Sequence, residues 1–457
     1  MKKFITTLQN IWSIKELRDR LLFTVGMLAV YRLGSYIVLP GVVPSVLEKA
    51  ANNNSTDLLG LINTFTGGAF NNAAIFALGV MPYITASIII QLLGFAVPYF
   101  QRLQQREGEA GRKKLNQISR MLAVAVTLVQ GSGYLTYISS QGAVSPNVPM
   151  GLFWSCNIII LAAGTIFAMW LGERIQIKGI GNGVSLIIMT GIMARLPGAF
   201  IFEFQSQFSN NALIVFILEL AMLFAIVMAT IMIVQGVRKI PIQFAKRMVG
   251  RDASSMPAAG NRDYIPLKVN AAGVMPIIFA QALMFLPATA VQFFSKGNND
   301  VSLNPVLRAL NDYTSLPYNA VYFLLVVIFT YVYTALLVNP TQYSEYLKRQ
   351  NAFIPGIKPG SSTADFIDAV TTRVTLPGSI FLGLISIMPS FAKGFGVNAS
   401  FAQFFGGTSL LIFVGVVLDT LSQIESHLLM QKYDGLVKSG RVQGRSAGGL
   451  AEIGAGI

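Results

Sequence analysis

The sequence holds little of the chemistry that enzymes and disulfide-stabilised domains use. Its single cysteine, Cys156, lies in an apolar run, which excludes a disulfide framework and a thiolate metal site. Its single histidine, His427, follows the last apolar run, where a lone histidine is more often structural than catalytic. No HExxH, GxSxG or P-loop pattern occurs. The sequence therefore predicts a protein that is not an enzyme and that needs no metal or cofactor.

Charged residues are scarce as well. They make up 12% of the chain, about half the share found in soluble domains, whereas 53% of the residues are hydrophobic. Apolar runs of about 20 residues, the length that crosses a bilayer as a helix, recur along the whole sequence. The predicted fold class is an all-α polytopic membrane protein.

Ten ranges are predicted to span the membrane: 21–39, 73–97, 118–138, 152–172, 183–197, 212–235, 272–293, 318–338, 374–392 and 404–425. The fifth is short for a full crossing, which a tilted or thinned environment or a missed extension would explain. Ten spans divide into five plus five, and an odd repeat unit makes the second half run opposite to the first. We therefore expect two inverted halves, at 21–197 and 198–425.

The basic residues indicate the orientation. With both termini on one side, only six of the 34 Lys and Arg residues fall on the other side, so 28 share the side of the termini. By the positive-inside rule, both termini are predicted to be cytoplasmic. The basic residues of segment 1–20 alternate with apolar ones, as in an amphipathic helix on the membrane surface. Residues 426–457 are expected to form a cytoplasmic tail.

A broken apolar helix lies between Asp57 and Leu93. Its second piece, from about Ala73 to Val97, is long enough to cross a bilayer, but its first, Leu58 to Phe65, is far too short. Because lipid cannot satisfy the backbone groups at the ends of a short helix, this piece must sit inside protein or line a cavity. Broken helices of this kind mark pathways through membranes. The alternative is a re-entrant packing element or an interfacial loop.

Aliphatic residues in four of the spans show where such a pathway could be narrowest. They are Val80, Ile84, Ile188, Ile192, Ile278 and Ile412. If they converge, they form an apolar constriction that resists water and ions by dewetting and suits sealing around a variable chain. The alternative is ordinary lipid-facing or core aliphatics. Two acids inside the spans, Glu219 and Asp419, keep a second function open, an ion-coupled secondary transporter with inverted repeats.

Two long basic loops, 236–271 and 339–373, face the predicted cytoplasmic side. In the first, Lys239 to Lys246 alternates as a strand does, and Tyr264 to Val269 could be the return strand. In the second, Pro-Gly pairs bracket Lys358 between two helical segments. Such loops suggest docking to a large anionic or acidic partner, with lipid head-group contact as the alternative.

The chain resembles the SecY family, the pore-forming subunits of Sec protein translocons, over nearly its whole length. The resemblance is carried, in the family's order, by FTGGAF, IFALGVMPYITASIIIQLL, REGEAGRKK, LGERI, KGIGNGVSLII, IPIQFAKRMVGR, IPLKVNAAGVMPIIFA, NPTQY, FIPGIKPG, RVTLPGSIFL and GGTSLLIFVGVVLDT. It implies a channel, built from two five-helix halves, that passes unfolded secretory polypeptides across the cytoplasmic membrane. Hydrophobic segments would leave that channel laterally into lipid.

The resemblance also implies roles for particular residues. The six aliphatics above would form the pore ring. A plug helix at 58–70 would close the outer funnel with Leu58, Leu61, Ile62, Phe65, Gly67, Gly68 and Phe70. The second and seventh spans would form a lateral gate with Thr85, Ser87, Gln91 and Gln281.

The partners that the resemblance implies are SecE and SecG subunits, the SecA motor ATPase, the ribosome with its nascent chain, signal sequences and membrane lipids. SecA and the ribosome would dock on Lys246, Arg247, Arg251 and Lys358. The family usually has Arg at the last of these positions, and Lys keeps the charge but loses the bidentate fork.

Overall fold

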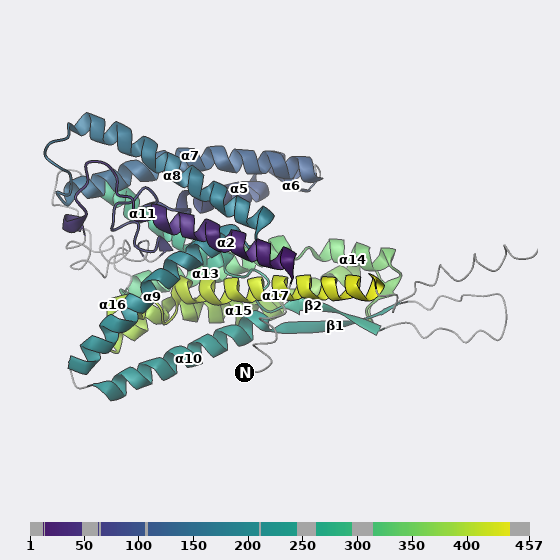
Figure 1. Cartoon of the computed structure of the whole chain (residues 1–457). Coiled ribbons are helices and arrows are strands. Elements are labelled where there is room, and N and C mark those ends of the chain that lie inside the picture. The colour runs from purple at the N-terminus through teal and green to yellow at the C-terminus, as the bar shows by residue number, and fades with distance from the viewer. Residues whose placement is uncertain are drawn as a thin grey trace, which may run out of the picture.

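The computed structural model describes residues 12, 14–47, 63, 65–105, 108–209, 212–244, 262–294 and 314–438. Most of them are helical (Figure 1). The N-terminal elements are α2 (Lys15–Gly34), α5 (Met81–Ala96), α6 (Pro98–Gln105), α7 (Gly108–Ser140), α8 (Met150–Lys178) and α9 (Gly183–Ser209). The later ones are α10 (Leu213–Gln235), β1 (Val237–Phe244), β2 (Arg262–Lys268), α11 (Met275–Phe294), α13 (Leu316–Leu337), α14 (Pro340–Arg349), β3 (Ala352–Phe353), α15 (Ser361–Gly394), α16 (Ala399–Ala402) and α17 (Gly407–Lys438).

The long helices are those of a multi-pass membrane protein. Within the described ranges, seven helical segments are long and apolar enough to cross a bilayer, and two shorter apolar helices lie at Met81–Gly94 and Met275–Met284. The helix that runs from Gly183 continues through Pro197 to Ser209, so the fifth span was predicted too short. Proline is tolerated inside membrane helices, where neighbouring groups satisfy the freed carbonyl. The boundary expected between the two halves, at 197, therefore falls inside α9.

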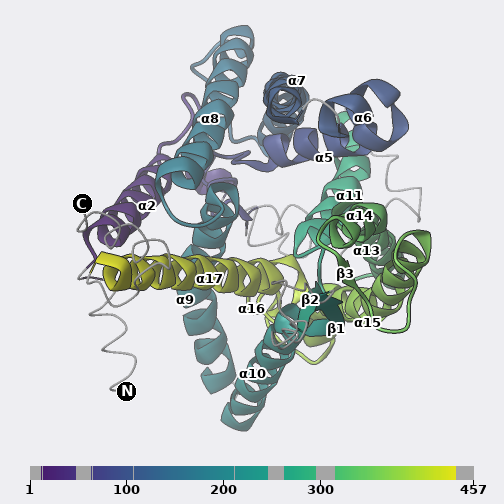
Figure 2. The ribbon, with the colours of Figure 1, turned by 90° about the vertical axis from the view of Figure 1, so that its right-hand side faces the viewer.

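The helices surround a common centre. Viewed along the bundle, α5, α7 and α8 lie on one side, and α10, α13 and α15 lie on the other (Figure 2). The two sides meet where α11 contacts α7 and α5, and again where α9 packs against α10 and α17. The centre is filled by a cluster of buried apolar side chains contributed by both sides. This cluster is where a pathway through the bundle would have to run.

The broken stretch is longer than the sequence predicts. Helix α5 has only 16 residues, and residues 66–80 form a series of turns instead of the start of a membrane-crossing helix. Positive φ angles at Gly67, Gly68, Ala73 and Gly79 prevent a continuous helix there. Within these turns, Ala74 forms an antiparallel bridge with Val38 after the end of α2.

Three further boundaries differ from the prediction. Helix α2 begins at Lys15, so the end of the proposed amphipathic segment 1–20 belongs to the first long helix, while residues 1–11 and 13 lie outside the described part. Helix α15 begins at Ser361, so the helical segment predicted after Lys358 is continuous with the span predicted from 374. Helix α17 continues to Lys438, well into the predicted tail, because residues after 425 still support helix formation although they are polar.

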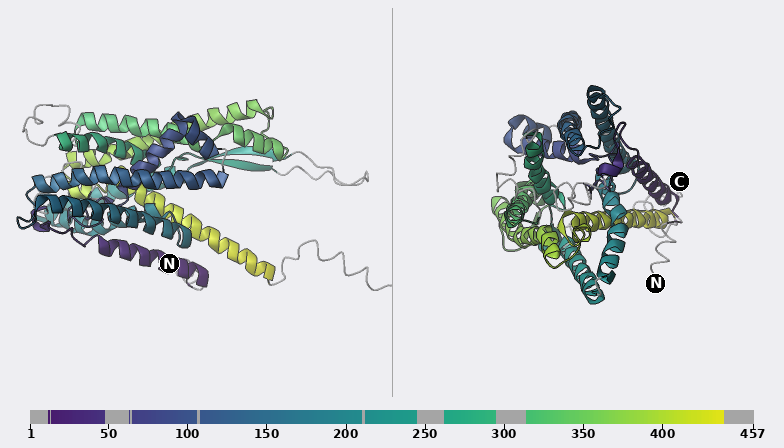
Figure 3. Two further views of the ribbon diagram at one scale, coloured as in Figure 1. Left: turned by 90° about the horizontal axis from the view of Figure 1, so that it is seen from above. Right: turned by 90° about the vertical axis from the view of Figure 1, so that its left-hand side faces the viewer.

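The class is not purely α-helical, because a small sheet stands at one end of the bundle. β1 pairs with β2 in antiparallel register, with Ile240 opposite Ile265, as the alternation in the first basic loop predicts. β1 also pairs with the two-residue strand β3, so that the strand order is β2-β1-β3 and both basic loops join one sheet. The β1–β2 hairpin, α14 and the C-terminal end of α17 lie at the same end of the molecule (Figures 1 and 3).

Candidate functional site: a central apolar constriction

The six aliphatic residues of the predicted ring meet in one cluster at the centre of the bundle. Five are buried, at 8% exposure or less, and Ile278 is half-buried and packs against them; the five are Val80, Ile84, Ile188, Ile192 and Ile412. They come from α9, α11 and α17 and from the start of α5. Burial excludes that the five face lipid, while a role in a ring rather than in an ordinary apolar core stays a prediction.

Local structure explains how these side chains reach the centre. Val80 is the N-cap residue of α5, and its carbonyl accepts a hydrogen bond from the backbone N–H of Ile84 at 3.1 Å. Pro82 stands in the first turn, where its missing N–H has no helical partner to lose. Ile188 and Ile192 are one turn apart on α9 and share a helix face. Five of the six residues thus stand on helices, and Val80 is the last turn residue before α5.

The described part of the predicted plug lies against this constriction. Phe65 belongs to the same buried cluster as the ring residues. A Cβ on Gly191 of α9 would stand 2.4 Å from the carbonyl oxygen of Phe65, and a Cβ on Gly67 would stand 2.7 Å from the Cα of Gly191. Glycine at both positions therefore allows the segment to touch α9 backbone to backbone. Leu58, Leu61 and Ile62 lie outside the described residues.

Phe70, the last residue of the predicted plug segment, packs against α7. Its ring centroid is 4.6 Å from that of Tyr134 on α7, and the Tyr134 hydroxyl donates to the Phe70 carbonyl at 2.6 Å. Gly68 has a φ of 95°, and its backbone N–H donates to the carbonyl of Asn63 at 2.9 Å. The two plug glycines thus stand at a turn between a part that touches the ring and a part that touches α7.

A cavity of about 130 Å³ opens beside this cluster, between α5, the start of α9 and α11. Three ring residues, Ile84, Ile188 and Ile278, form part of its wall. Ser87 and Gln91, two of the predicted gate residues, line it as well, and the Gln91 amide donates to the Ser87 hydroxyl at 3.3 Å. All residues that line this cavity are uncharged. It therefore presents no charged group beside the buried cluster.

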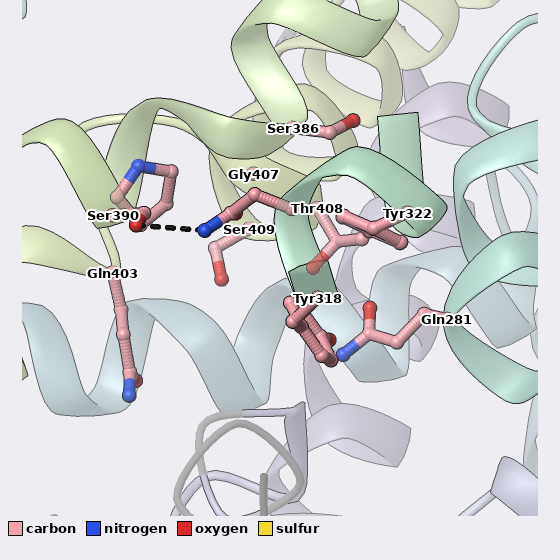
Figure 4. Close-up of a pocket in the computed structure, with 11 residues that line it drawn as sticks. Gln281, Tyr318, Tyr322, Ser386, Ser390, Gln403, Gly407, Thr408 and Ser409 are labelled. Atoms are coloured by element: carbon pink, nitrogen blue, oxygen red, sulfur yellow. Dashed lines mark hydrogen bonds between the residues drawn. The ribbon is translucent and has the colours of Figure 1, made fainter. Parts of the chain in front are cut away.

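The other two predicted gate residues lie elsewhere. The Thr85 hydroxyl donates to the Met81 carbonyl within α5. Gln281 on α11 lines a separate small cavity of about 30 Å³ with residues of α13, α15 and α17, as Figure 4 shows. In that cavity the Asn319 amide donates to the hydroxyl of Ser390 at 2.9 Å. The structure thus brings two of the four gate residues to the cavity beside the ring.

The two acids on which the transporter alternative depends, Glu219 and Asp419, lie in different environments. Glu219 on α10 is buried, and it accepts a hydrogen bond from the Gln207 amide at 3.3 Å. The same amide donates to Glu203 at 2.9 Å, and Glu203 also accepts from the backbone N–H of Asn398. Asp419, by contrast, is exposed on α17. Within the described residues no group of three or more potential metal ligands occurs.

The docking residues can be placed only in part. Lys246, Arg247 and Arg251 lie outside the described residues. Lys358 is exposed in the turn between β3 and α15, and its carbonyl accepts a hydrogen bond from the Thr363 hydroxyl at 2.9 Å. Ile354 and Ile367 fix this turn to the sheet through a small buried cluster. The lysine side chain is therefore presented on an ordered turn at the end of the molecule that carries the sheet.

Sequence reasoning missed two contributors to this site. Gly191 stands next to Ile192 and three residues after Ile188, so a lone glycine on the ring face of α9 was the available signal. Tyr134 gave no signal, because its contact with Phe70 joins residues 64 positions apart.

The fold is that of a multi-pass membrane protein with a buried apolar cluster at its centre. The chain belongs to the SecY family, whose model matches residues 74–421. It is 42% identical over 443 residues to the protein translocase subunit SecY of Halalkalibacterium halodurans, covering 94% of this chain and 99% of that protein. It is 38% identical over 454 residues to the SecY subunit of Mycobacterium tuberculosis, covering 96% and 100%.

Solved structures share the fold at low sequence identity. One described as the structure of a protein conducting channel has a TM-score of 0.62 and 17% identity, and the match covers 90% of this chain and 92% of that one. Sec61 in the canine ribosome-channel complex has a TM-score of 0.58, 17% identity and the same coverage. By family, this chain is therefore a channel subunit of a protein translocase and not an enzyme.

Proposed function

We propose that the chain conducts unfolded secretory polypeptides across the cytoplasmic membrane through the central constriction and releases hydrophobic segments sideways into lipid. The observation that carries this proposal is the convergence of the six aliphatic side chains in one cluster, with Phe65 packed among them. An apolar ring excludes water and ions when closed, and it makes no directional bonds that would favour one passing sequence over another. Both properties suit a conduit for chains of varied composition.

The segment from Leu58 to Phe70 acts as the plug. The backbone contact of Phe65 and Gly67 with Gly191 supports this assignment, because it places the described end of the segment against two ring residues on the same helix. Displacement of the segment would uncover the ring from one side. A seal made of two layers, ring and plug, remains closed to ions even when one layer fluctuates.

The lateral gate lies where α5 meets α11. Their interface is bordered by the cavity that Ser87 and Gln91 line, and the two helices belong to opposite sides of the bundle. Opening there would connect the constriction with lipid. A hydrophobic segment would then partition outward, gaining about 0.3–0.6 kcal/mol for each Leu, Ile, Phe or Val at the centre of a span. Thr85 and Gln281 do not line this cavity, and their part in the gate stays a prediction.

Ten spans in two inverted halves, with both termini cytoplasmic, complete the proposal. The sheet and α14 then face the cytoplasm, where Lys358 and the first basic loop would dock a SecA motor or a ribosome. Ribosome docking is supported by the fold shared with Sec61 in a ribosome-channel complex and with the yeast Ssh1 complex bound to the 80S ribosome. SecE and SecG subunits would complete the assembly.

Reconstitution tests this function against the transporter alternative. Vesicles that contain the protein with its partner subunits receive a motor ATPase, ATP and a secretory precursor. We expect ATP-dependent protection of the precursor from added protease. The proposal fails if no protection develops and the vesicles instead accumulate a small solute on a proton gradient, with Asp419→Asn abolishing that uptake.

A further inference from the structure

The plug segment is bound to different parts of the molecule before and after Gly67. After this residue, the chain is anchored by bonds that do not involve the ring. The backbone N–H of Leu39 donates to the Ala73 carbonyl at 2.8 Å, and that of Ile75 donates to the Ile37 carbonyl at 2.9 Å. Together with the Tyr134 bond to Phe70, these contacts fasten residues 70–75 to α7 and to the loop after α2. That part of the segment is therefore built as a fixed stem.

Gly67 itself is held by a side chain from another helix. Arg32, in the last turn of α2, donates through Nη1 to the Gly67 carbonyl at 2.6 Å. A hydrogen bond from an ionised donor is about twice as strong as one between neutral groups. A Cβ on Gly67 would stand 2.8 Å from this nitrogen and 2.9 Å from the carbonyl oxygen of Gly191. The glycine is thus enclosed between α2 and α9.

The guanidinium of Arg32 is positioned for this bond. Its second nitrogen donates to the hydroxyl of Tyr36 at 2.9 Å, and its central carbon lies 4.9 Å from the centre of the Tyr36 ring. The stacking and the hydrogen bond restrict the guanidinium plane and leave Nη1 directed at Gly67. Because Gly67 and Gly68 have φ angles of 64° and 95°, the backbone at this point can rotate through conformations that other residues avoid. The bond therefore sits at a pivot. Turning the chain there also breaks the bonds from the backbone N–H groups of Gly68 and Asn71 to Asn63, and the bond from that of Phe70 to the Thr66 hydroxyl.

We propose that Arg32 is a positioning residue that latches the plug shut, by holding the Gly67 carbonyl at the pivot between the movable plug and its fixed stem. This inference rests on the proposed function of the channel. Opening breaks the bond and leaves a half-buried cation without its acceptor, a loss that the signal sequence or the motor must overcome. Arg32 thereby sets how strong a signal sequence must be to open the channel.

The test compares three variants in the reconstituted complex. Arg32→Gln removes the charge and the geometry of the bond, Arg32→Lys keeps a cationic donor, and Arg174→Gln removes a half-buried cation of α8 that stacks on Trp170 of its own helix. We expect Arg32→Gln to raise both the resting ion leak and the transport of a precursor with a weakened signal sequence, each on the order of tenfold. Arg32→Lys should restore most of the seal, and Arg174→Gln should match the wild type.

A second measurement leaves Arg32 in place and so does not depend on the folding of its variants. Single cysteines replace Phe65 or Asn71 in a Cys156→Ser background, and a membrane-impermeant maleimide is added from outside. Trapping a precursor in the channel should change labelling severalfold at position 65 and leave it constant at position 71.

The two sets of results separate this inference from the proposed function. The latch is wrong if the wild type transports precursor while Arg32→Gln retains wild-type leak and stringency, or if Arg174→Gln has an equal effect. It is also wrong if labelling at positions 65 and 71 changes together, because the pivot would then lie elsewhere. Failure of the wild type to transport any precursor would instead contradict the channel function itself.

Discussion

Gly67 and Gly191 lie in direct backbone contact, although 124 positions separate them: a Cβ on Gly67 would stand 2.7 Å from the Cα of Gly191. Ile188 and Ile192 flank this contact on α9. The plug segment therefore rests on the same helix face that supplies one third of the ring. A side chain at position 191 would therefore displace the plug segment next to two residues of the proposed ring.

A methyl group at that position should loosen the seal. In Gly191→Ala the new Cβ would stand 2.4 Å from the Phe65 carbonyl oxygen, and because this neighbour is backbone, the plug segment must shift. We expect a severalfold rise in resting ion conductance. Gly198→Ala is the matched control, since a Cβ there meets nothing within 4 Å on the same helix. Equal conductance in the two variants would show that the plug does not rest on Gly191.

A polar side chain in the proposed ring should allow precursors with weaker signal sequences to pass. Ile278 is the least buried ring residue, so Ile278→Thr places a hydroxyl in the constriction without emptying a packed core. We expect transport of a precursor with a weakened signal sequence to rise on the order of tenfold, which corresponds to about 1.4 kcal/mol. Ile328→Thr, on an exposed face of α13, is the control. If both variants transport like the wild type, Ile278 is not part of the seal.

Charge rather than bidentate geometry should matter at Lys358. This side chain is exposed on an ordered turn, so Lys358→Arg should bind a motor ATPase or ribosomes as the wild type does, while Lys358→Glu should weaken binding severalfold at low salt. Affinity measured across a salt series provides the readout. An effect of Lys358→Glu that persists undiminished at high salt would contradict an electrostatic role.

The Gln207 amide should be a structural bridge between α9 and α10. It donates to both Glu203 and Glu219, so Gln207→Leu leaves two buried carboxyl groups facing one another without their shared donor. We expect destabilisation by about 1–3 kcal/mol in thermal or denaturant unfolding of the purified complex. Gln205→Leu should be neutral, because Gln205 stands two residues before Gln207 on the same helix and is exposed. Unchanged stability of the Gln207 variant would mean that the bridge contributes nothing.

Hydropathy predicted where helices lie far better than where they end. Each of the ten predicted ranges contains part of a helix, because about 20 apolar residues in sequence leave few other structures in lipid. Ends depend on features that hydropathy does not register. α9 passes through Pro197 and continues to Ser209, and α17 extends into polar residues up to Lys438.

The candidate site was predictable where it depends on local pattern and not where it depends on tertiary contact. Residue spacing together with the family resemblance indicated six aliphatic residues that the structure gathers in one cluster, and the strand alternation before Phe244 indicated the hairpin. The length of the break was not predictable, since the turns up to Val80 are held by bonds to distant backbone such as that between Leu39 and Ala73. The bond from Arg32 to Gly67 joins residues 35 positions apart, and no periodicity encodes it.

Cross-linking of a trapped chain tests the central claim most directly. With Cys156 replaced by serine, single cysteines are placed at Ile188, at Ile278 or at the exposed position Leu152 of α8, and a cysteine-bearing precursor is halted midway through the channel. The account predicts disulfides between the precursor and both ring positions, and none with position 152. Efficient transport with no cross-link at either ring position would contradict it.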